Sequence, residues 1–387
     1  MAATMTAIML EPGVYNRLEI DLAALGDNYC QLVALVGPQV RVLAVVKADA
    51  YGHGLVEVAG CLVRAGATTF GVADVAEGRR LRQAGITGEV LVMLGGRTGT
   101  VADLLAHDLT PVIYDREYLC ELAAAAAVLG RTAPVHLKVD TGMRRLGILP
   151  EELPEYVELI GSLASLRLAG VLSHFPLSDG EDLAPTSEQN RLFSEMVAAL
   201  GVAWEVPLIH IANSAAFLRE PQSRHDLVRA GITLYGYYPG GDPSLRANLA
   251  LRPVMSFTSR ILQVKEVPAG CGVSYGHLFR TERPSRLAVL PVGYADGYLR
   301  RLTGRAQVLI GGRRVPVVGR ICMNLCMADI TGLDGVIPGD EVVLLGRQGE
   351  AEISADELAA WQETISYEVL CLLGASNPRF YLPGPGG

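Results

Sequence analysis

The sequence predicts an α/β protein in which a (β/α)₈ barrel of the TIM type is followed by a smaller, mainly antiparallel β domain. Between residues 42 and 236, short apolar runs alternate with stretches that carry helical signals. Eight such repeats within about 200 residues match the length and rhythm of a (β/α)₈ barrel. After residue 251 the pattern changes to short alternating runs broken by Gly and Pro, without a long helical pattern before residue 354. This second pattern is typical of an antiparallel β domain.

The apolar runs of the first part are rich in β-branched residues and nearly uncharged, as expected of parallel strands that are buried on both faces. Among the stretches between them, residues 57–65 are amphipathic and residues 121–129 are rich in alanine, which indicates helices. The predicted barrel strands are 42–46, 69–73, 90–94, 109–114, 135–139, 168–173, 208–211 and 227–234.

The second part is predicted to hold five strands and one helix. The strands are 259–267, 286–290, 306–310, 314–318 and 341–345, and the helix is 354–373. The predicted domain bounds are 1–14 for an N-terminal extension, 15–246 for the barrel and 247–387 for the β domain. Residues 15–21 could instead pair with the β domain.

Composition narrows the class of protein. The chain has 387 residues, of which 50% are hydrophobic, so it can bury a large core. Its net charge is -8 and it has no basic run, which argues against nucleic acid or an anionic membrane as partner and favours a small-molecule substrate. Seven cysteines suit free thiols in a reducing compartment. Cys322 and Cys326 lack a second Cys or His cluster, so no metal site is predicted. Without a signal peptide pattern or a run of about 18 apolar residues, the chain is predicted to be cytoplasmic.

The stretch VVKADAYGHG at 45–54 places Lys47 at the end of an apolar strand. In α/β folds the carboxyl ends of strands carry the chemistry. A desolvated lysine loses part of its proton affinity and becomes a nucleophile that can form a Schiff base. Taken alone, a strand-end lysine that simply reaches solvent is the more frequent case, so this residue needs support from the rest of the chain.

Residues near the ends of the predicted strands supply that support, because all of them should gather at one mouth of the barrel. Tyr51 follows the first strand, residues 138–145 the fifth, His174 the sixth, and Asn213 and Ser214 the seventh, while Arg229, Gly231 and Ile232 lie on the eighth. Loops after strands seven and eight of such barrels commonly hold phosphate through backbone N–H groups. Ser214 is predicted as a helix N-cap that could also bind phosphate. A lysine nucleophile with a phosphate cradle indicates pyridoxal 5′-phosphate, or alternatively sugar-phosphate aldolase chemistry.

Nine motifs decide between these two chemistries. They are VVKADAYGHG at 45–54, HLKVDTGMRRLG at 136–147, SHF at 173–175, HIANSAA at 210–216, VRAGITLYG at 228–236, VSYG at 273–276, GYADGY at 293–298, GRICMN at 319–324 and ISYEVL at 365–370. Together they resemble alanine racemase, a fold-type III pyridoxal-phosphate enzyme, and they occur in the family's order over almost the whole chain.

The resemblance implies a role for each cofactor-site residue. Lys47 would hold pyridoxal phosphate as an internal aldimine, and Arg229 would face the pyridine nitrogen, oriented by His174. A guanidinium keeps its proton, so the ring nitrogen would stay unprotonated and the cofactor would be a poorer electron sink. This favours rapid reprotonation of Cα over transamination. The residues that would bind the phosphate or complete the cofactor site are Tyr51, Asn213, Ser214, Gly231, Ile232 and Tyr367.

Racemisation needs acid–base groups on both faces of Cα. The resemblance assigns one face to Lys47 and the other to Tyr275 of the second subunit of a head-to-tail homodimer. Arg145 would bind the substrate carboxylate, the partner's Met323 N–H would assist, and Tyr294 would line the entry. Lys138 would be carbamylated to N6-carboxylysine and position Arg145. The implied reaction is the interconversion of L-alanine and D-alanine, an isomerase activity that supplies D-alanine for peptidoglycan.

Two positions depart from the family pattern, since Arg144 stands where Gly is usual and Asn324 where Asp is usual. Both changes alter charge near the substrate entrance, so a racemase of broader amino-acid specificity stays open as an alternative. A fold-type III amino-acid decarboxylase is a further alternative. The Arg145 carboxylate clamp argues against it. A non-catalytic pyridoxal-phosphate carrier would need only the barrel.

Overall fold

The computed structural model of the chain describes residues 15–97, 99–200, 208–241, 244–245 and 249–384. Contacts among these residues divide the chain into two compact units. The barrel unit comprises Leu22–Arg252 with the last residues of the chain, and the β unit comprises Pro253–Leu382 with the segment that ends at Asp21. The predicted extension at 1–14 and the predicted boundary between 246 and 247 lie outside the described residues.

The barrel unit is built on eight parallel strands, as predicted. Their order in the sheet is β8-β7-β6-β5-β4-β3-β2-β9. The sheet nearly closes, since the N–H of Arg229 donates to the carbonyl of Ala212 at 3.0 Å and the N–H of Asp226 donates to that of Ile209 at 3.1 Å. The strands are β2 (Arg41–Val45), β3 (Thr69–Val72), β4 (Glu89–Val92), β5 (Thr110–Ile113), β6 (Ala133–Lys138), β7 (Leu166–Leu172), β8 (Ile209–His210) and β9 (Leu227–Ala230).

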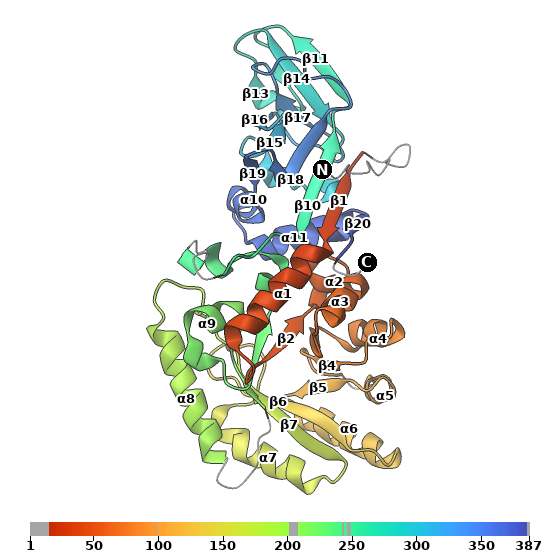
Figure 1. The fold of residues 1–387 in the computed structure, drawn as a ribbon, viewed down its shortest axis with the longest axis vertical. Helices are drawn as coiled ribbons and strands as arrows, with labels where there is room; N and C mark the ends of the chain where they lie inside the picture. Colours follow the sequence, from red (N-terminus) through yellow and green to blue (C-terminus); the bar gives the residue numbers. More distant parts are fainter. Residues whose placement is uncertain (1–14, 98, 201–207, 242–243, 246–248, 385–387) are drawn as a thin grey trace, which may run out of the picture. The chain divides into compact units, whose positions relative to one another are not determined.

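Amphipathic helices cover the outside of these strands (Figure 1). In α3, the apolar side chains Leu55, Val58, Ala59 and Leu62 are buried, and their spacing puts them on one face of the helix. Two helices begin at aspartate caps: Asp74 for α4 and Asp115 for α6. The helices are α1 (Leu22–Val36), α3 (Leu55–Arg64), α4 (Val75–Gln83), α5 (Val101–Ala106), α6 (Arg116–Val128), α7 (Leu153–Ser162), α8 (Ala184–Leu200) and α9 (Ser214–Arg219).

The last barrel strand is shorter than predicted. The prediction ran from 227 to 234, whereas β9 ends at Ala230 and a 3₁₀ turn, η3 (Ile232–Tyr235), follows. The reason is local, because the N–H of Gly231 donates to Ser214 Oγ at 2.9 Å. The turn places backbone N–H groups at the barrel mouth.

The β unit holds a mainly antiparallel sheet in the order β11-β14-β17-β16-β15-β18-β10-β1-β20, with β19 paired to β18. Among the strand pairs of this sheet in the described residues, only β1 and β20 run parallel. Strands β12 (Gly272–Val273) and β13 (Phe279–Arg280) form a separate hairpin. The sheet strands are β1 (Arg17–Asp21), β10 (Met255–Arg260), β11 (Gln263–Val267), β14 (Ser285–Leu290), β15 (Gln307–Ile310), β16 (Arg313–Val318), β17 (Cys326–Asp329), β18 (Glu341–Gln348), β19 (Ala351–Ile353) and β20 (Arg379–Leu382).

Three details of the β unit differ from the prediction. The predicted strand 259–267 is two strands, because the chain changes partners at Ile261 and Leu262, from β18 to β14. The predicted helix 354–373 is two helices, α10 (Ala355–Gln362) and α11 (Ser366–Ser376), separated at Glu363, which has a left-handed backbone with φ 58°. Strand β1, placed by the predicted bounds in the barrel, pairs with β10 and β20. Figure 1 shows β1 in red beside β10.

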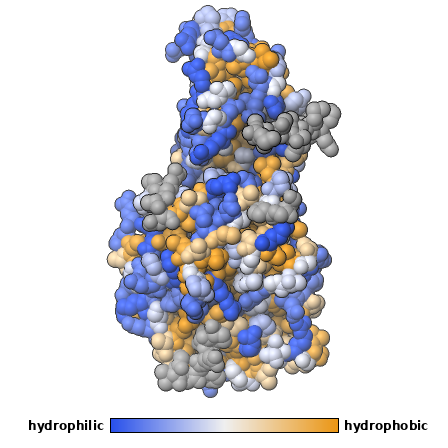
Figure 2. Space-filling view, viewed as in Figure 1, coloured by the Kyte–Doolittle hydropathy of each residue, from blue (hydrophilic) through white to orange (hydrophobic). Residues whose placement is uncertain are grey.

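No helix in the described ranges is long and apolar enough to span a membrane. On the face drawn in Figure 2, groups of apolar residues alternate with polar ones. All seven cysteines are free thiols. Within the described part of the chain, no group of three or more His, Cys, Asp or Glu side chains is placed to hold a metal ion.

Candidate active site

Lys47 follows β2 directly and begins a short turn of unusual handedness. Residues Ala48, Asp49, Ala50 and Tyr51 all have left-handed backbones, with φ of 54°, 53°, 57° and 54°. For residues with a side chain, each such conformation costs roughly 1–2 kcal/mol. Four in succession therefore require strong support from the surroundings.

Hydrogen bonds on both sides of the turn supply this support. The N–H of Asp49 donates to Glu77 Oε1 at 3.0 Å, and Glu77 Oε2 accepts from the N–H of Ala73 at 2.8 Å. The Asp49 carboxylate in turn accepts from the N–H of Leu55 at 3.0 Å. On the inner side, His53 Nδ1 lies 3.0 Å from the carbonyls of both Ala50 and Tyr51. The turn therefore holds Lys47 and Tyr51 at fixed positions at the carboxyl end of β2.

Four cations converge at this mouth. Lys138, the last residue of β6, is 8% exposed. Burial, together with the charges of Arg229, Arg145 and Lys47, lowers the pKa of Lys138 to about 8. The charges of Arg229, Arg145 and Lys47 therefore all act on Lys138. Such a concentration of positive charge suits a phosphate and a carboxylate.

A loop organised by Asp140 presents Arg145. The Asp140 carboxylate accepts from the N–H groups of Gly142, Arg144 and Arg145 at 3.0, 3.0 and 2.9 Å. Burial raises the pKa of Asp140, but these backbone donors outweigh it and hold the pKa below its usual value. Arg144 adopts φ 54°, a left-handed backbone that glycine adopts without strain. The glycine that is usual in the family would adopt this backbone without strain.

Arg229 lies on β9 with its guanidinium buried among acceptors. Its Nη2 donates to the carbonyls of Ser173 and Ile211, both at 2.8 Å, and to His174 Nδ1 at 3.0 Å. Its Nη1 lies 3.1 Å from His210 Nδ1. Burial lowers the pKa of Arg229 to about 10, so the group remains charged at neutral pH.

Both histidines that contact Arg229 are neutral. Burial, followed by the charge of Arg229, lowers the pKa of His174 and of His210 well below the usual value. Because a guanidinium only donates, Nδ1 of each ring must accept. Each ring therefore carries its proton on Nε2. The predicted contact between His174 and Arg229 is present in this geometry.

Tyr51, Ser214 and Gly231 meet at one point of the mouth. A Cβ added at Gly231 would lie 2.7 Å from Tyr51 Oη and 3.7 Å from Ser214 Oγ. Ser214 Oγ also lies 3.1 Å from Thr233 Oγ1. Gly231 thus lies directly against these hydroxyls, with no room for a side chain, so hydroxyls and backbone N–H groups gather as they do in a phosphate cradle.

The prediction that Ser214 is a helix N-cap is wrong. The cap of α9 is Asn213, whose Oδ1 accepts from the N–H groups of Ala215 and Ala216 at 3.1 and 3.0 Å. Ser178 Oγ donates to the same oxygen at 3.0 Å. Ser214 is the first helical residue, so its hydroxyl points to η3 instead of to its own helix.

The remaining predicted site residues lie in the β unit. Tyr275 begins a short turn, η6 (Tyr275–His277), between residues with positive φ, Ser274 at 60° and Gly276 at 70°. The tyrosine is 70% exposed, so it does not have the cross-strand packing role that is usual for a tyrosine in a β domain. Met323 is 56% exposed and Tyr294 40%. Tyr367 lies in the first turn of α11.

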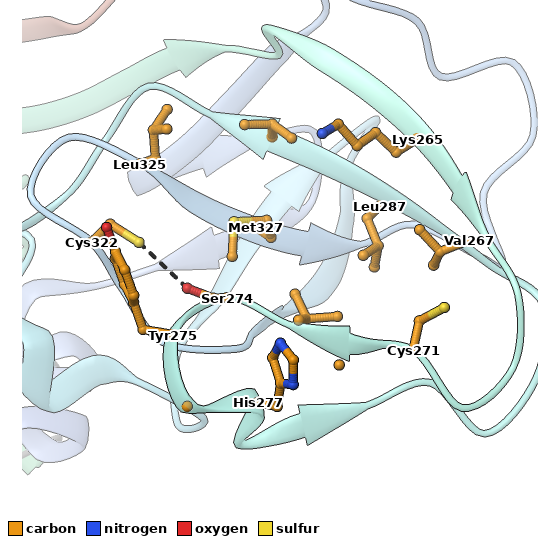
Figure 3. Close-up of a pocket in the computed structure, with 14 residues that line it drawn as sticks. Lys265, Val267, Cys271, Ser274, Tyr275, His277, Leu287, Cys322, Leu325 and Met327 are labelled. Carbon is orange, nitrogen blue, oxygen red and sulfur yellow. Dashed lines mark hydrogen bonds between the residues drawn. The ribbon is translucent and has the colours of Figure 1, made fainter.

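Figure 3 shows Tyr275 beside Cys322 at one end of a cavity of about 630 Å³ within the β unit. Ser274 Oγ donates to the carbonyl of Arg320 at 2.6 Å and lies 3.4 Å from Cys322 Sγ, which fixes the backbone just before Tyr275. The turn therefore presents the phenol outward from a well-anchored base.

Three residues near the site were missed by the sequence analysis. Thr233 contacts Ser214, His210 contacts Arg229, and His136 Nδ1 lies 2.9 Å from His210 Nε2. His136 stands two residues before Lys138 on one strand, and residues two apart point to the same face. A polar residue at alternate positions of an otherwise apolar strand is the signal that could have revealed it.

Two sequence models of one family match nearly the whole chain. "Alanine racemase, N-terminal domain" matches residues 20–239, and "Alanine racemase, C-terminal domain" matches residues 254–381. The chain is 44% identical over 370 residues to an alanine racemase of Syntrophobacter fumaroxidans, covering 96% of this chain and 98% of that protein. It is 42% identical over 365 residues to one from Desulfovibrio desulfuricans, covering 94% and 97%.

Solved structures agree with these matches. The crystal structure of alanine racemase from D-cycloserine producing Streptomyces lavendulae has a TM-score of 0.91 and 38% identity, covering 97% of this chain and 98% of that one. The alanine racemase of Bartonella henselae, described with covalently bound pyridoxal phosphate, has a TM-score of 0.86 and 28% identity, covering 95% and 100%.

Proposed function

The chain belongs to the alanine racemase family, and from this premise we propose that it interconverts L-alanine and D-alanine with pyridoxal 5′-phosphate, using Lys47 and Tyr275 as its two proton-transferring residues. Strict preference for alanine over larger amino acids, supply of D-alanine for peptidoglycan and a cytoplasmic location are parts of the same proposal. The observation that carries it is the buried, charged guanidinium of Arg229 between two neutral histidines, at the same mouth as Lys47.

The barrel residues fit pyridoxal phosphate. Tyr51 Oη and Ser214 Oγ gather beside Gly231, where a side chain would not fit, and hydroxyls are donors that a phosphate needs. We propose that Tyr51, Ser214 and the N–H groups of Gly231 and Ile232 bind the phosphate, with Asn213 fixing the helix that carries Ser214. Tyr367 of the β unit is proposed to add a hydroxyl. When bound, the cofactor supplies an aldehyde that takes up the substrate amino group and a ring that withdraws electrons from Cα.

The two faces of Cα are proposed to be served by different subunits. Lys47 Nζ exchanges a proton on one face, and Tyr275 Oη of a second copy exchanges it on the other. The 70% exposure of Tyr275 suits a group that serves a neighbouring subunit. Large apolar side chains are exposed in the same unit and would be covered in a homodimer: Leu278, Tyr294, Met323 and Leu325.

Substrate binding is proposed to depend on Arg145 and on the partner copy. The guanidinium of Arg145 can hold the carboxylate of alanine with two hydrogen bonds. The N–H of Met323 and the side chain of Tyr294, both from the second copy, would complete the pocket. A decarboxylase gains little from such a clamp, because its reaction must release the carboxylate.

Exchange of the Cα hydrogen in D₂O tests the function directly. Purified protein with pyridoxal phosphate is incubated with L-alanine, and optical rotation and Cα deuterium are followed together. Loss of rotation with deuterium at Cα is expected. Deuterium uptake without loss of rotation would mean that only one face is served and would contradict the two-residue proposal.

Replacing Gly231 with alanine is expected to weaken cofactor binding at least tenfold. The new Cβ would lie 2.7 Å from Tyr51 Oη and would displace this hydroxyl, which is proposed to bind the phosphate. Titration of the cofactor-free protein with pyridoxal phosphate, followed by its visible absorbance, measures the effect. Gly332→Ala is a control for general damage, since nothing lies within 4 Å of a Cβ there and its backbone is not left-handed. Unchanged affinity in Gly231→Ala would place the phosphate elsewhere.

Lys138 is proposed to take up CO₂ as a carbamate, which would turn a cation beside Arg145 into an anion. Only the neutral amine reacts with CO₂. With its pKa lowered to about 8, Lys138 is mostly protonated at pH 6 and mostly neutral at pH 9. Carbamate in the cofactor-free protein is therefore expected to increase as pH rises through about 8. ¹³C NMR with labelled bicarbonate measures this signal. A signal that persists in Lys138→Gln, or none in the wild type at pH 9, would reject the modification.

A further inference from the structure

A row of hydrogen-bonding side chains crosses the barrel interior behind Arg229. It runs from Arg229 on β9 to His210 on β8, His136 on β6 and Glu89 on β4. Arg229 Nη1 lies 3.1 Å from His210 Nδ1, His210 Nε2 lies 2.9 Å from His136 Nδ1, and His136 Nε2 lies 3.6 Å from Glu89 Oε1. His210 and His136 are 0% and 1% exposed.

Arg229, the first residue of the row, determines which nitrogen of each histidine carries the proton. Arg229 can only donate, so His210 Nδ1 accepts and the single proton of this neutral ring sits on Nε2. That proton is donated to His136 Nδ1. Because Nδ1 of His136 accepts, the proton of this ring sits on Nε2, facing Glu89. Within the described residues, His136 Nε2 has no hydrogen-bond partner at normal distance, so the carboxylate at 3.6 Å is the acceptor it faces.

Charges at the two ends favour this arrangement. Contact with His136 lowers the pKa of Glu89, and Arg41 and Arg167 act in the same direction, so the carboxylate is ionised at neutral pH. Each imidazole then has its N–H directed to the anion and its bare nitrogen directed to the cation of Arg229. Both ring dipoles are aligned with the field between the ends, which stabilises one tautomer of each ring.

Glu89 is also where the row meets solvent. With Arg41, Thr110 and Arg167 it lines a cavity of about 340 Å³. These residues lie at the amino ends of the barrel strands, whereas Lys47 follows the carboxyl end of β2. The row therefore connects the cofactor side of the barrel to its opposite end.

We propose that His136 and Glu89 are positioning residues for Arg229, which act by holding His210 in the tautomer whose Nδ1 accepts from the guanidinium. The inference rests on the proposed function for the role of Arg229 at the cofactor. If the His210 proton moved to Nδ1, it would face an N–H of Arg229, and donor would oppose donor. Nη1 would then keep only the carbonyl of His210, at 3.3 Å. The guanidinium would then be oriented mainly by its Nη2 contacts to Ser173, Ile211 and His174, and Nη1 would be held less firmly.

The tautomers of both histidines can be measured by NMR in protein without bound cofactor and without an activity assay. In protein labelled with ¹⁵N-histidine, a protonated ring nitrogen and a bare one have widely separated chemical shifts. We expect a bare Nδ1 and a protonated Nε2 in both His210 and His136 at neutral pH, with assignments from the His136→Phe variant. A protonated Nδ1 on His210, or a second proton on that ring, would overturn the proposal.

A pair of substitutions at Glu89 tests the positioning effect. Glu89→Leu removes the acceptor, so Nδ1 of His210 should be bare in only part of the molecules. We expect kcat to fall about tenfold with KM unchanged, which is the size of effect that residues supporting a site from the next layer commonly show. Glu89→Gln keeps an acceptor oxygen and should retain both the tautomer and most of the rate. The ¹⁵N shift of the bound cofactor's pyridine nitrogen should move in the Leu variant only.

His225→Asn is the matched control, because His225 is a half-buried barrel histidine bonded to Asn190 Oδ1 at 2.9 Å, outside the row. Its backbone has φ 44°, which asparagine tolerates. Equal losses in Glu89→Leu, Glu89→Gln and His225→Asn would indicate general damage and reject the proposal. A wild-type protein that does not racemise alanine would refute the proposed function but leave the tautomer measurement intact. The two failures are thus distinguishable.

Discussion

Replacing Lys47 with alanine is expected to abolish racemisation in both directions, by at least about 10⁴-fold. Two functions are lost at once. Nζ no longer attaches the cofactor, and no base remains on the barrel's face of Cα. The left-handed turn that follows is held by hydrogen bonds of Glu77, Asp49 and His53. The variant should therefore fold normally.

Three measurements examine this result: the rate from each enantiomer, the visible absorbance of bound pyridoxal phosphate, and the peptide labelled by the cofactor after borohydride reduction. The chain contains only two other lysines, Lys138 and Lys265. Lys265→Arg is the matched control, since Lys265 lies on β11 of the other unit, and it should keep full activity. Retained turnover in Lys47→Ala would contradict the assignment of Lys47 as the residue that attaches the cofactor and transfers the proton.

Replacing Tyr275 with phenylalanine should separate the two faces of Cα. The phenol oxygen is the proposed proton acceptor for L-alanine, so kcat should fall about 10²–10⁴-fold, with KM and cofactor content little changed. Lys47 still serves the other face. D-alanine in D₂O should therefore gain deuterium at Cα with its configuration retained, whereas L-alanine should gain almost none.

Tyr298→Phe is the control for Tyr275→Phe. Tyr298 is 1% exposed in the same unit, and its hydroxyl has no partner among the described residues, so losing it should cost little stability and no activity. If Tyr275→Phe loses cofactor in proportion to activity, the residue holds the cofactor instead of moving a proton. Equal exchange of both enantiomers would also contradict its assigned role.

Mixing the two inactive variants tests whether sites are shared. If Tyr275 serves the partner's site, a dimer of one Lys47→Ala and one Tyr275→Phe subunit has one site with both residues intact. Random reassociation of equal amounts should then restore roughly a quarter of wild-type activity, because half of the dimers are mixed and each has one good site of two. If each subunit uses its own tyrosine, mixing restores none.

The barrel was predictable because its signal is local. Each strand is a short apolar run between helical patterns, and all eight runs were found to within a few residues. Lys47 and Arg229 could be placed at one mouth because parallel strands share a direction, which makes strand ends neighbours. The motif resemblance then assigned their roles.

What escaped prediction depends on contacts between distant parts of the chain. The left-handed turn at 48–51 is supported by Glu77, which lies on α4. The residue types Ala and Asp in the turn do not by themselves indicate a left-handed backbone. Asn213, and not the predicted Ser214, caps α9, because Ser214 Oγ accepts a hydrogen bond from the N–H of Gly231. Likewise, the pairing of His136 with His210 spans two strands that are separated by 74 positions.

Strand β1 has a consequence for how the chain is made. It leaves the ribosome long before its neighbours β10 and β20, which begin 238 and 362 residues later, at Met255 and Arg379 against Arg17. At about 5–20 residues per second, β10 appears roughly 12–48 s after β1, and β20 roughly 20–70 s after it. The intervening barrel can fold co-translationally before β10 appears. Until then nascent β1 has neither partner and exposes the alternate apolar residues Leu18 and Ile20, which makes it a natural place for a chaperone to bind.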